Sequence, residues 1–350
     1  MHKGRTESVN NSGGGDVLLH EALSADATLR YFLFYHYRFT LHATSSLAFF
    51  NGDVGTTLRG AFGSVLREIV CIDGHQECPA CSIRVQCVFP TVFSPVQKPG
   101  TGPKRQQSPP RGFVIKPPLS SKNRYDPGEA LVFDFILVGR LKDYLPYVIV
   151  PFTELGRRGI GLGRGKFTLA AIDAVKADGS TLPLYKDTDG LVRDVSVPIA
   201  IGDLSALFPL PTNREVSLSF LTPTHIRFNP TGEKGKSRPA RNPEFFHIAC
   251  RLRDRISALC REYGPAPLDM DFKDYGERSR QIRSVESQLA WVEDMRTSRS
   301  GQRHDLSGFV GNITFDGDLT EFWPFLVLGQ YLHVGDNAVF GRGWYRIKMA

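Results

Sequence analysis

The sequence lacks any long hydrophobic run. None of its apolar stretches approaches the roughly 20 residues that a helix needs to cross a bilayer. Its N-terminus, MHKGRTESVNNSGGGD, also lacks the apolar core of a signal peptide. We therefore expect a cytoplasmic protein whose thiols stay reduced, and we interpret residues 1–29 as a disordered leader.

Two common nucleotide-binding motifs are also missing. A P-loop requires Ser or Thr after Gly165-Lys166, and the chain has Phe167 there. A dinucleotide fingerprint follows a strand and opens a helix, whereas the glycines at 159, 161, 163 and 165 follow a helix-like stretch and precede a strand-like one. These glycines therefore do not indicate an ordinary nucleotide-binding loop.

The sequence does carry an excess of positive charge. Its 350 residues include 43 Lys and Arg against 36 Asp and Glu, which gives a net charge of +7. The length and the 41% hydrophobic content suit two domains, each with its own core. A basic chain favours an acidic partner, and nucleic acid is the first candidate; an ordinary basic enzyme is the alternative.

Two glycine-rich loops occupy similar positions in the two halves. The first, at 156–167, reads GRRGIGLGRGKF, and the second, at 335–345, reads GDNAVFGRGWY. Glycine permits positive φ and close approach of the backbone to a ligand, and arginine offers paired donors that match phosphate. The repeat predicts a duplicated unit that binds a polyanion.

The order of the predicted elements repeats as well. The first half has strands at 31–44, 113–117, 130–139 and 166–175, with helices at 55–70 and 142–155. The second half has strands at 215–228, 288–295, 308–315 and 344–349, with helices at 243–263 and 319–332. Each half is a βαββαβ unit, so we predict an α+β fold of tandem ferredoxin-like (RRM-like) domains. The domains would span 30–175 and 215–350, joined by a linker with small strands at 176–214.

Four cysteines are grouped after the first predicted helix. They are Cys71, Cys78, Cys81 and Cys87, with spacers of six, two and five residues. Such spacing allows four thiolates to bind one tetrahedral ion, and Zn²⁺ is the commonest structural choice. His75 can replace one thiolate, an iron–sulfur cluster fits the same spacing, and unpaired cysteines are the simpler alternative. We interpret residues 71–87 as a structural metal loop, and 95–112, rich in Pro, Gly and Lys/Arg, as a mobile insertion.

Three histidines stand near these features. His36 and His42 share the polar face of the first strand with Arg38, and His333 directly precedes the second glycine loop. An exposed strand face is the alternative reading for the first two, and a structural role for His333. The basic run at 296–304 mixes arginines with hydroxyl and amide donors, which suits contacts to phosphate and sugar.

Six segments combine these features and together span most of residues 31–348. They are LRGAFGSVLREIVC at 58–71, CVFPTVF at 87–93, ELGRRGIGLGRGKFTL at 154–169, SFLTPTHIR at 219–227, WVEDMRTSRSGQRHDLSGFVGNITFDGDL at 291–319 and LGQYLHVGDNAVFGRGWYRI at 328–347. In this order they resemble the CRISPR-associated endoribonucleases of the RAMP superfamily that process precursor crRNA, specifically the group with a distinctive C-terminal domain and a Cys-rich loop. Two positions depart from that family's pattern: Asp336 stands where lysine is usual, and Thr297 where an aromatic residue is usual.

The resemblance implies metal-independent cleavage of CRISPR repeat RNA. The ribose 2′-hydroxyl attacks the adjacent phosphate and leaves a cyclic phosphate and a 5′-hydroxyl. This chemistry needs a base, an acid and cations that stabilise the transition state. Histidine is the natural acid–base group near neutral pH, so the resemblance makes His36, His42 and His333 the catalytic candidates.

The resemblance also implies how the RNA is held. The expected RNA-binding residues are Arg157, Arg158, Arg164, Lys166, Arg296, Arg299 and Arg342. The expected cofactor is structural Zn²⁺ with no catalytic metal, and the expected partners are repeat RNA and other CRISPR effector subunits rather than a membrane. Two alternatives remain: a non-catalytic crRNA-binding subunit of an effector complex, and a zinc-stabilised RNA-binding protein outside CRISPR systems.

Overall fold

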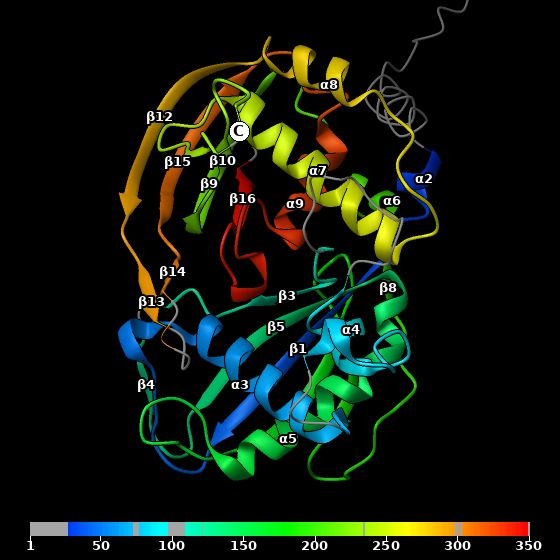
Figure 1. Ribbon diagram of the computed structural model, residues 1–350, viewed down its shortest axis with the longest axis vertical. Helices are drawn as coiled ribbons and strands as arrows, with labels where there is room; N and C mark the ends of the chain where they lie inside the picture. The colour runs from blue at the N-terminus through cyan, green and yellow to red at the C-terminus, as the bar shows by residue number, and fades with distance from the viewer. Residues whose placement is uncertain are drawn as a thin grey trace, which may run out of the picture.

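The structure, a computed structural model, describes residues 27–72, 77–96, 109–120, 122–233, 235–297, 301 and 303–348. Most of the predicted leader and of the predicted insertion therefore lies outside the described residues, as do His75 and Arg299. The described chain forms two domains stacked along the long axis of the molecule, with the first half below and the second half above in Figure 1. Within the described ranges, no helix is long and apolar enough to span a membrane.

The first domain has the predicted βαββαβ order. Its main elements are β1 (Phe34–Ala43), α3 (Val54–Val70), β3 (Phe113–Lys116), β5 (Ala130–Val138), α5 (Pro146–Arg158) and β6 (Phe167–Val175). The antiparallel strand order is β3-β5-β1-β6-β7, so the first strand of the unit lies between the third and the fourth, as in ferredoxin-like folds. The shorter elements are α2 (Ala27–Arg30), β2 (Leu47–Ala48), η1 (Phe50–Gly52), η2 (Cys78–Ala80), α4 (Val88–Val92), β4 (Arg124–Tyr125) and η3 (Gly139–Tyr144).

The segment expected to be a linker belongs in part to the first domain. β7 (Thr181–Lys186) pairs with β6 and forms an edge of the sheet, and β8 (Pro198–Ile199) pairs with the start of β1. Leu184 and Ile199 are buried in the core. The boundary predicted at residue 175 is therefore too early, because these strands complete the first sheet. The short helix α6 (Ile201–Ser205) follows.

The second domain repeats the arrangement. Its main elements are β9 (Glu215–Thr224), α7 (Phe245–Tyr263), α8 (Phe272–Ser279), β12 (Arg283–Val292), β15 (Gly308–Asp316), α9 (Trp323–Leu332) and β16 (Tyr345–Lys348). Their antiparallel order, β12-β15-β9-β16, matches that of the first domain. The shorter elements are β10 (Arg227–Phe228), β11 (Arg238–Pro239), β13 (Met295–Thr297), β14 (Arg303–Asp305) and η4 (Ala338–Phe340). Figure 1 shows β12 and β15 as a long curved ribbon that leads to β13 and β14 beside the start of α3.

Aromatic packing fixes helix α3 on the first sheet. The helix begins after Asp53, whose carboxylate accepts a hydrogen bond from the backbone N–H of Thr56 at 3.1 Å. Its apolar face includes Phe62, whose ring stacks on that of Phe152 from α5 at 5.7 Å. Both rings are fully buried, and Phe39 of β1 contacts Phe152 at 5.3 Å. The helices therefore cover the sheet face that carries Phe39, and the alternate residues of β1 point to the opposite face.

The second glycine loop joins the two domains. A Cβ atom at Gly55, near the start of α3, would lie 2.4 Å from the carbonyl oxygen of Phe340. A Cβ atom at Gly341, where φ is +83°, would lie 2.4 Å from Cδ of Pro117. These glycines thus allow close contact between the two domains, which is a different use of glycine from the ligand contact that the sequence suggested.

Candidate functional site

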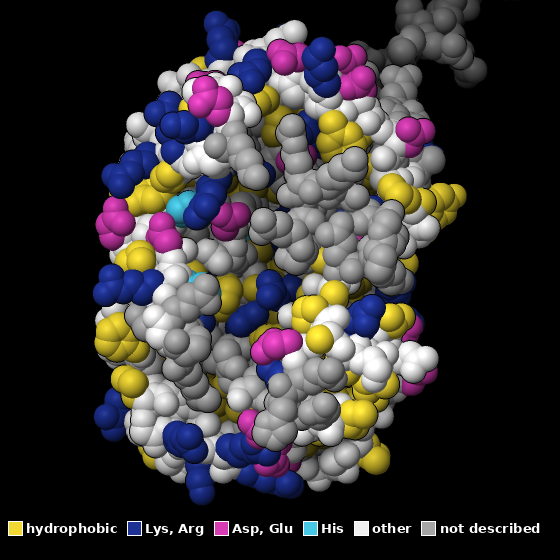
Figure 2. Space-filling view, in the orientation of Figure 1, with side chains coloured by type: hydrophobic (Ala, Val, Ile, Leu, Met, Phe, Trp, Pro, Cys, Tyr) yellow, Lys and Arg dark blue, Asp and Glu magenta, His cyan; other side chains and the backbone are white. Residues whose placement is uncertain are grey.

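A cleft of about 660 Å³ opens between the two domains. The first domain lines it with the sheet face opposite its helices, and the second domain with α9 and β16. The residues that carry its chemistry are His36, Lys116, Asp134, Tyr331, Trp344 and Arg346. On the face shown in Figure 2, Lys and Arg side chains are spread over both domains, and a group of them lies at mid-height between the two.

His36 lies on β1 against a carboxylate of the neighbouring strand. Its Nε2 atom is 2.9 Å from Oδ2 of Asp134, and Arg38 Nε donates to Oδ1 of the same carboxylate at 2.9 Å. Burial lowers the pKa of His36, and this outweighs the opposing effect of Asp134. Burial alone would raise the pKa of Asp134, but His36 and Arg38 hold it well below its usual range. The arrangement therefore favours a neutral imidazole beside an ionised carboxylate.

Lys116 is the unexpected member of the cleft. It ends β3, and its Nζ atom lies 4.4 Å from the centroid of the Trp344 ring and 5.2 Å from that of Tyr331. Its hydrogen bond runs to the carbonyl oxygen of Gln330 at 3.4 Å, and among the described residues it has no ion pair. Burial lowers the pKa of Lys116 to about 8. The cleft thus contains an ammonium group that can release a proton near neutral pH.

His333 lies behind the wall of the same cleft. It is fully buried, with φ of +63°, and its ring stacks on Trp344 at 5.8 Å. Its Nδ1 atom lies 3.0 Å from the carbonyl oxygen of Arg342. Burial, followed by the charges of Lys116 and Arg255, holds the pKa of His333 well below its usual value. This histidine supports the second glycine loop and does not itself line the cleft.

His42 does not join the other two histidines. It lies near the far end of β1, opposite Ala130 on one neighbouring strand and Thr168 on the other, and it is exposed. The structure therefore brings His36 and His333 to one region, on either side of Lys116 and Trp344, and leaves His42 outside it.

The predicted RNA-binding residues of the first glycine loop differ in their partners. Arg157 and Arg158 both pair with Glu154, at 3.7 and 2.7 Å, and Arg158 also contacts Glu68. Arg164 and Lys166 are exposed, and within the described part of the chain neither has an ion pair. The free positive charge of this loop therefore lies at Arg164, in the turn closed by Ile160 and Gly165, and at Lys166, directly before β6.

The remaining predicted RNA-binding residues lie around the second glycine loop. Arg342 is largely buried and pairs with Asp53, at 3.3 Å, and with Asp294, so it links the start of α3 to the end of β12. Arg296 is half-buried near the ring of Phe340, at 5.7 Å. Arg299 lies outside the described residues, so its role stays a prediction.

The four cysteines of the predicted metal loop line one small cavity of about 20 Å³. All four are free thiols. Burial raises the pKa of Cys78, with further contributions from the other three thiols and an opposing one from Arg67. Four thiols around one cavity fit a tetrahedral ion in number and kind. As the described side chains stand, however, no three His, Cys, Asp or Glu residues are arranged to hold a metal ion.

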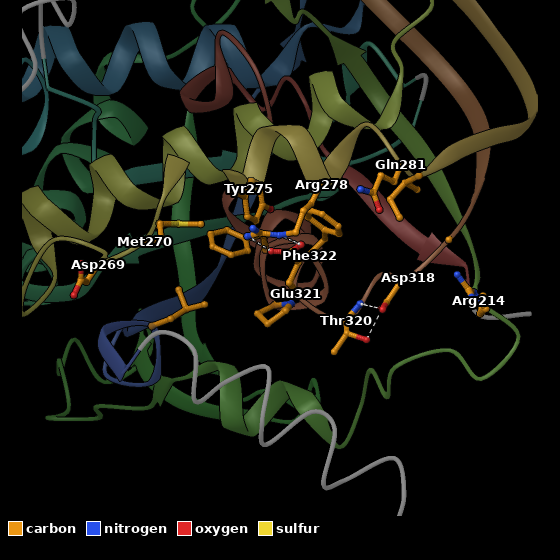
Figure 3. Close-up of a pocket in the computed structure, with 15 residues that line it drawn as sticks. Arg214, Asp269, Met270, Tyr275, Arg278, Gln281, Asp318, Thr320, Glu321 and Phe322 are labelled. Atoms are coloured by element: carbon orange, nitrogen blue, oxygen red, sulfur yellow. Dashed lines mark hydrogen bonds and ion pairs between the residues drawn. The ribbon is translucent and has the colours of Figure 1, made fainter. Parts of the chain in front are cut away.

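Another cavity, of about 560 Å³, lies beside α8 and α9 in the second domain (Figure 3). Tyr275 and Phe322 contribute rings to it, and Arg278 pairs with Glu321 through two hydrogen bonds of 2.7 and 2.8 Å. None of the site residues predicted from the sequence lines this cavity.

Sequence reasoning did not find Lys116, Asp134, Tyr331 or Trp344 as parts of the site. A weak signal was available for the first two, because each is the charged residue of an otherwise apolar strand, FVIK and ALVFDFILV. The two aromatic residues carried no such signal, since Tyr and Trp are ordinary core residues.

Comparisons with known proteins agree with this architecture. Residues 31–197 match a family described as an N-terminal domain, and residues 218–345 match the family of the CRISPR-associated endoribonuclease Cas6. A Cas6 product complex shares the fold with a TM-score of 0.53 at 15% identity, over 90% of this chain and 99% of that chain. A partial Cas6-RT-Cas1–Cas2 complex gives 0.55 at 12% identity, over 91% of this chain and 46% of that chain. No curated protein sequence matches.

The fold defines a class, namely proteins with two tandem ferredoxin-like domains and a glycine-rich loop before the fourth strand of each βαββαβ unit. The match of the second domain is more specific, because residues 218–345 are similar to the family of the CRISPR-associated endoribonuclease Cas6.

Proposed function

We propose that the protein is a metal-independent endoribonuclease that cleaves CRISPR repeat RNA in the interdomain cleft. One observation carries this proposal: a buried histidine and a buried lysine, each with a lowered pKa, share one cleft with two aromatic rings. A neutral imidazole can accept a proton at pH 7, and an ammonium group with a pKa of about 8 can donate one. The family match of the second domain supports RNA processing as the role.

The proposed reaction assigns a base and an acid. Asp134, beside Nε2 of His36, favours the tautomer that carries its proton there and leaves the lone pair on Nδ1. Nδ1 takes the proton of the ribose 2′-hydroxyl while the 2′-oxygen attacks phosphorus. The bond from phosphorus to the 5′-oxygen breaks, and Lys116 gives that oxygen a proton. The products are a 2′,3′-cyclic phosphate and a 5′-hydroxyl, so atoms and protons balance without a metal ion.

The remaining groups of the cleft suit RNA binding. Tyr331 is partly exposed at the cleft and presents an aromatic ring on which a base can stack, whereas Trp344 is buried against His333 and Lys116. Arg346 is exposed at the cleft and has no ion pair among the described residues, so it is available for a phosphate. Asp134 acts as a positioning residue, because it orients His36 without touching RNA.

The test is to incubate the protein with its cognate CRISPR repeat RNA in the presence of EDTA. We expect one discrete cut and a cyclic-phosphate end. His36→Ala should lower the single-turnover rate by about a hundredfold or more, the usual contribution of a positioned acid or base. His42→Ala should retain the rate, because His42 lies outside the cleft. Equal rates for His36→Ala and the wild type would refute the site assignment.

A second candidate function is RNA binding without cleavage. The low exposure of the His36 side chain, 8%, favours it, because the ring is reached through the cleft alone. The same assay separates the two functions, since tight binding with intact RNA would identify a non-catalytic subunit. Because one structural neighbour is a Cas6-RT-Cas1–Cas2 complex, further Cas proteins are proposed partners.

We further propose that Cys71, Cys78, Cys81 and Cys87 hold a structural Zn²⁺ ion, as their shared cavity suggests. Such an ion would fix the loop that follows α3. Purified protein should contain about one equivalent of zinc by mass spectrometry, and Cys78→Ser with Cys81→Ser should abolish it. Cys250→Ser is the control, because that cysteine lies on α7. A zinc content near zero in protein purified without chelators would refute this assignment.

A further inference from the structure

Three arginines form a cluster at the junction of the two domains. Arg59 extends from α3, and its guanidinium carbon lies 4.2 Å from the centroid of the Phe93 ring and 4.7 Å from that of Phe340 in the second glycine loop. Arg296 of β13 reaches the same Phe340 ring, at 5.7 Å. Arg111 donates from Nε to the carbonyl oxygen of Phe93 at 2.7 Å. Two phenyl rings thus hold the guanidinium groups of Arg59 and Arg296, and the backbone of Phe93 holds that of Arg111.

The cluster has no counter-charge within the described residues. None of the three arginines forms an ion pair there, and Nε of Arg59 is buried without a hydrogen-bond partner. Burial, followed by the charges of Arg111 and Arg296, lowers the pKa of Arg59 to about 9. Unpaired, partly buried cations that repel one another are unfavourable for the folded state.

The neighbouring carboxylates do not neutralise the three arginines. Asp53 and Asp294 are near, but both are paired with Arg342. Glu293 precedes Arg296 by three residues, but it pairs with Arg241 at 3.2 Å. The segments before Arg111 and after Arg296 add only positive charge. Residues 97–108 read QKPGTGPKRQQS and residues 298–302 read SRSGQ, without a single acidic residue.

The cluster borders a second cleft, of about 820 Å³, to which Arg296 and Phe340 both contribute. Asn51, Thr57 and Ser120 add polar groups to its lining. Residues 117–119 line both this cleft and the one that contains His36. The two clefts therefore share a wall. An extended single strand of nucleic acid can pass from one cleft to the other across it.

We propose that Arg59, Arg111 and Arg296 bind backbone phosphate of the RNA, and that the strand runs from this cluster across residues 117–119 into the cleft of His36. This inference rests on the proposed function for the identity of its ligand. Guanidinium groups match phosphate through paired donors, and phosphate contacts set the register of a nucleic acid without reading its sequence. An RNA phosphate would also supply the missing negative charge.

The experiment measures binding separately from cleavage. The probe is a fluorescent repeat RNA made with 2′-fluoro sugars, which lack the attacking hydroxyl. Its Kd is measured over a range of salt concentrations for the wild type, Arg296→Gln, Arg59→Gln and the double variant. The matched control is Arg280→Gln, because Arg280 also lies over a phenyl ring, that of Phe246 at 3.6 Å, but has a carboxylate partner, Glu277 at 3.7 Å.

We expect Arg296→Gln to weaken binding about tenfold at low salt and to reduce the slope of log Kd against log salt by about 0.7, the value for one phosphate contact on a single strand. The double variant should lose more, and Arg280→Gln should match the wild type. Without RNA, the thermal midpoint of Arg296→Gln should equal or exceed that of the wild type, because a repulsive charge has been removed. A purely structural arginine would instead lower that midpoint.

Unchanged affinity and slope in the double variant would overturn the proposal, as would an equal loss in Arg280→Gln. The measured Kd does not depend on whether the protein cleaves RNA. If the wild type binds ordinary repeat RNA without cutting it, the endoribonuclease proposal fails while the arginine site stands. If the wild type cuts RNA and the double variant binds like the wild type, the arginine site alone fails.

Discussion

The buried lysine of the cleft predicts a specific pH dependence of RNA cleavage. With a pKa of about 8, Lys116 is roughly nine-tenths protonated at pH 7 and roughly one-tenth protonated at pH 9. If it donates the proton to the leaving oxygen, the single-turnover rate should fall about tenfold between these two pH values. At the acid end the rate should fall once His36 becomes protonated, because the base is then lost. The profile should be bell-shaped.

Substitution of the lysine tests the origin of the alkaline limb. Lys116→Arg keeps a positive charge that does not titrate below pH 10, so the fall between pH 7 and 9 should disappear, at a lower overall rate because arginine is a poor acid. Single-turnover cleavage of repeat RNA from pH 5 to 9.5 measures both limbs. The reasoning is refuted if Lys116→Arg retains the alkaline limb of the wild type.

The same lysine predicts how stability depends on pH. Its pKa is about 8 in the folded protein, against the ordinary 10.5 in the unfolded chain. Between these values the unfolded chain binds more protons, so the free energy of unfolding should rise with pH across that window. Lys116→Met should therefore stabilise the protein at pH 7 by roughly 1–3 kcal/mol while it slows cleavage. Urea unfolding of both proteins at pH 7 and 9.5 checks this, and equal stabilities at pH 7 would contradict it.

Further variants test the rest of the site and the fold. Asp134→Asn should slow cleavage at least about tenfold and move the acid limb to lower pH, because His36 loses the nearby negative charge; a profile unchanged in position would exclude this positioning role. Gly55→Ala should destabilise the protein by about 1–3 kcal/mol, since its Cβ atom would overlap a carbonyl of the second glycine loop. Gly202→Ala, in a helix with open space around the new methyl group, is the control and should be neutral or stabilising. Phe62→Ala should lower the free energy of unfolding by about 3–5 kcal/mol, because the ring is fully buried among other rings; urea titration measures all three stability effects.

Local periodicity was sufficient to predict the fold. The strand at 31–44 alternates apolar and polar residues, and β1 places Phe39 toward the helices and His36 on the opposite face, as that alternation requires. The error at the linker has a physical cause. β7 is a mostly exposed edge strand that forms a hairpin with β6, so its sequence shows little alternation. β8 has only two residues, and its pairing with β1, which is distant in the sequence, defines it.

The candidate site was less predictable, because contacts between the domains create it. The polar face of β1 suggested solvent exposure for His36, yet the residue is buried, since Tyr331 and β16 of the second domain cover that face. Lys116 precedes two prolines in a loop-like context, and nothing local to it reveals that Trp344 lies 4.4 Å away. Periodicity reports which face of an element is apolar, but it does not report which other element covers the polar face.

The glycine loops show how one pattern can carry more than one physical meaning. Alternating glycine and arginine predicts phosphate binding, and in the first loop Arg164 and Lys166 have no ion pair within the described residues. In the second loop the glycines instead admit the backbone of the first domain, and Arg342 is paired with two carboxylates. Arg342 is therefore not free to bind a phosphate, and it links Asp53 to Asp294 within the loop that carries Phe340. The same loop lines the cleft of His36 through Trp344 and the second cleft through Phe340, so a change that separates the domains should impair the proposed cleavage and the proposed phosphate binding together.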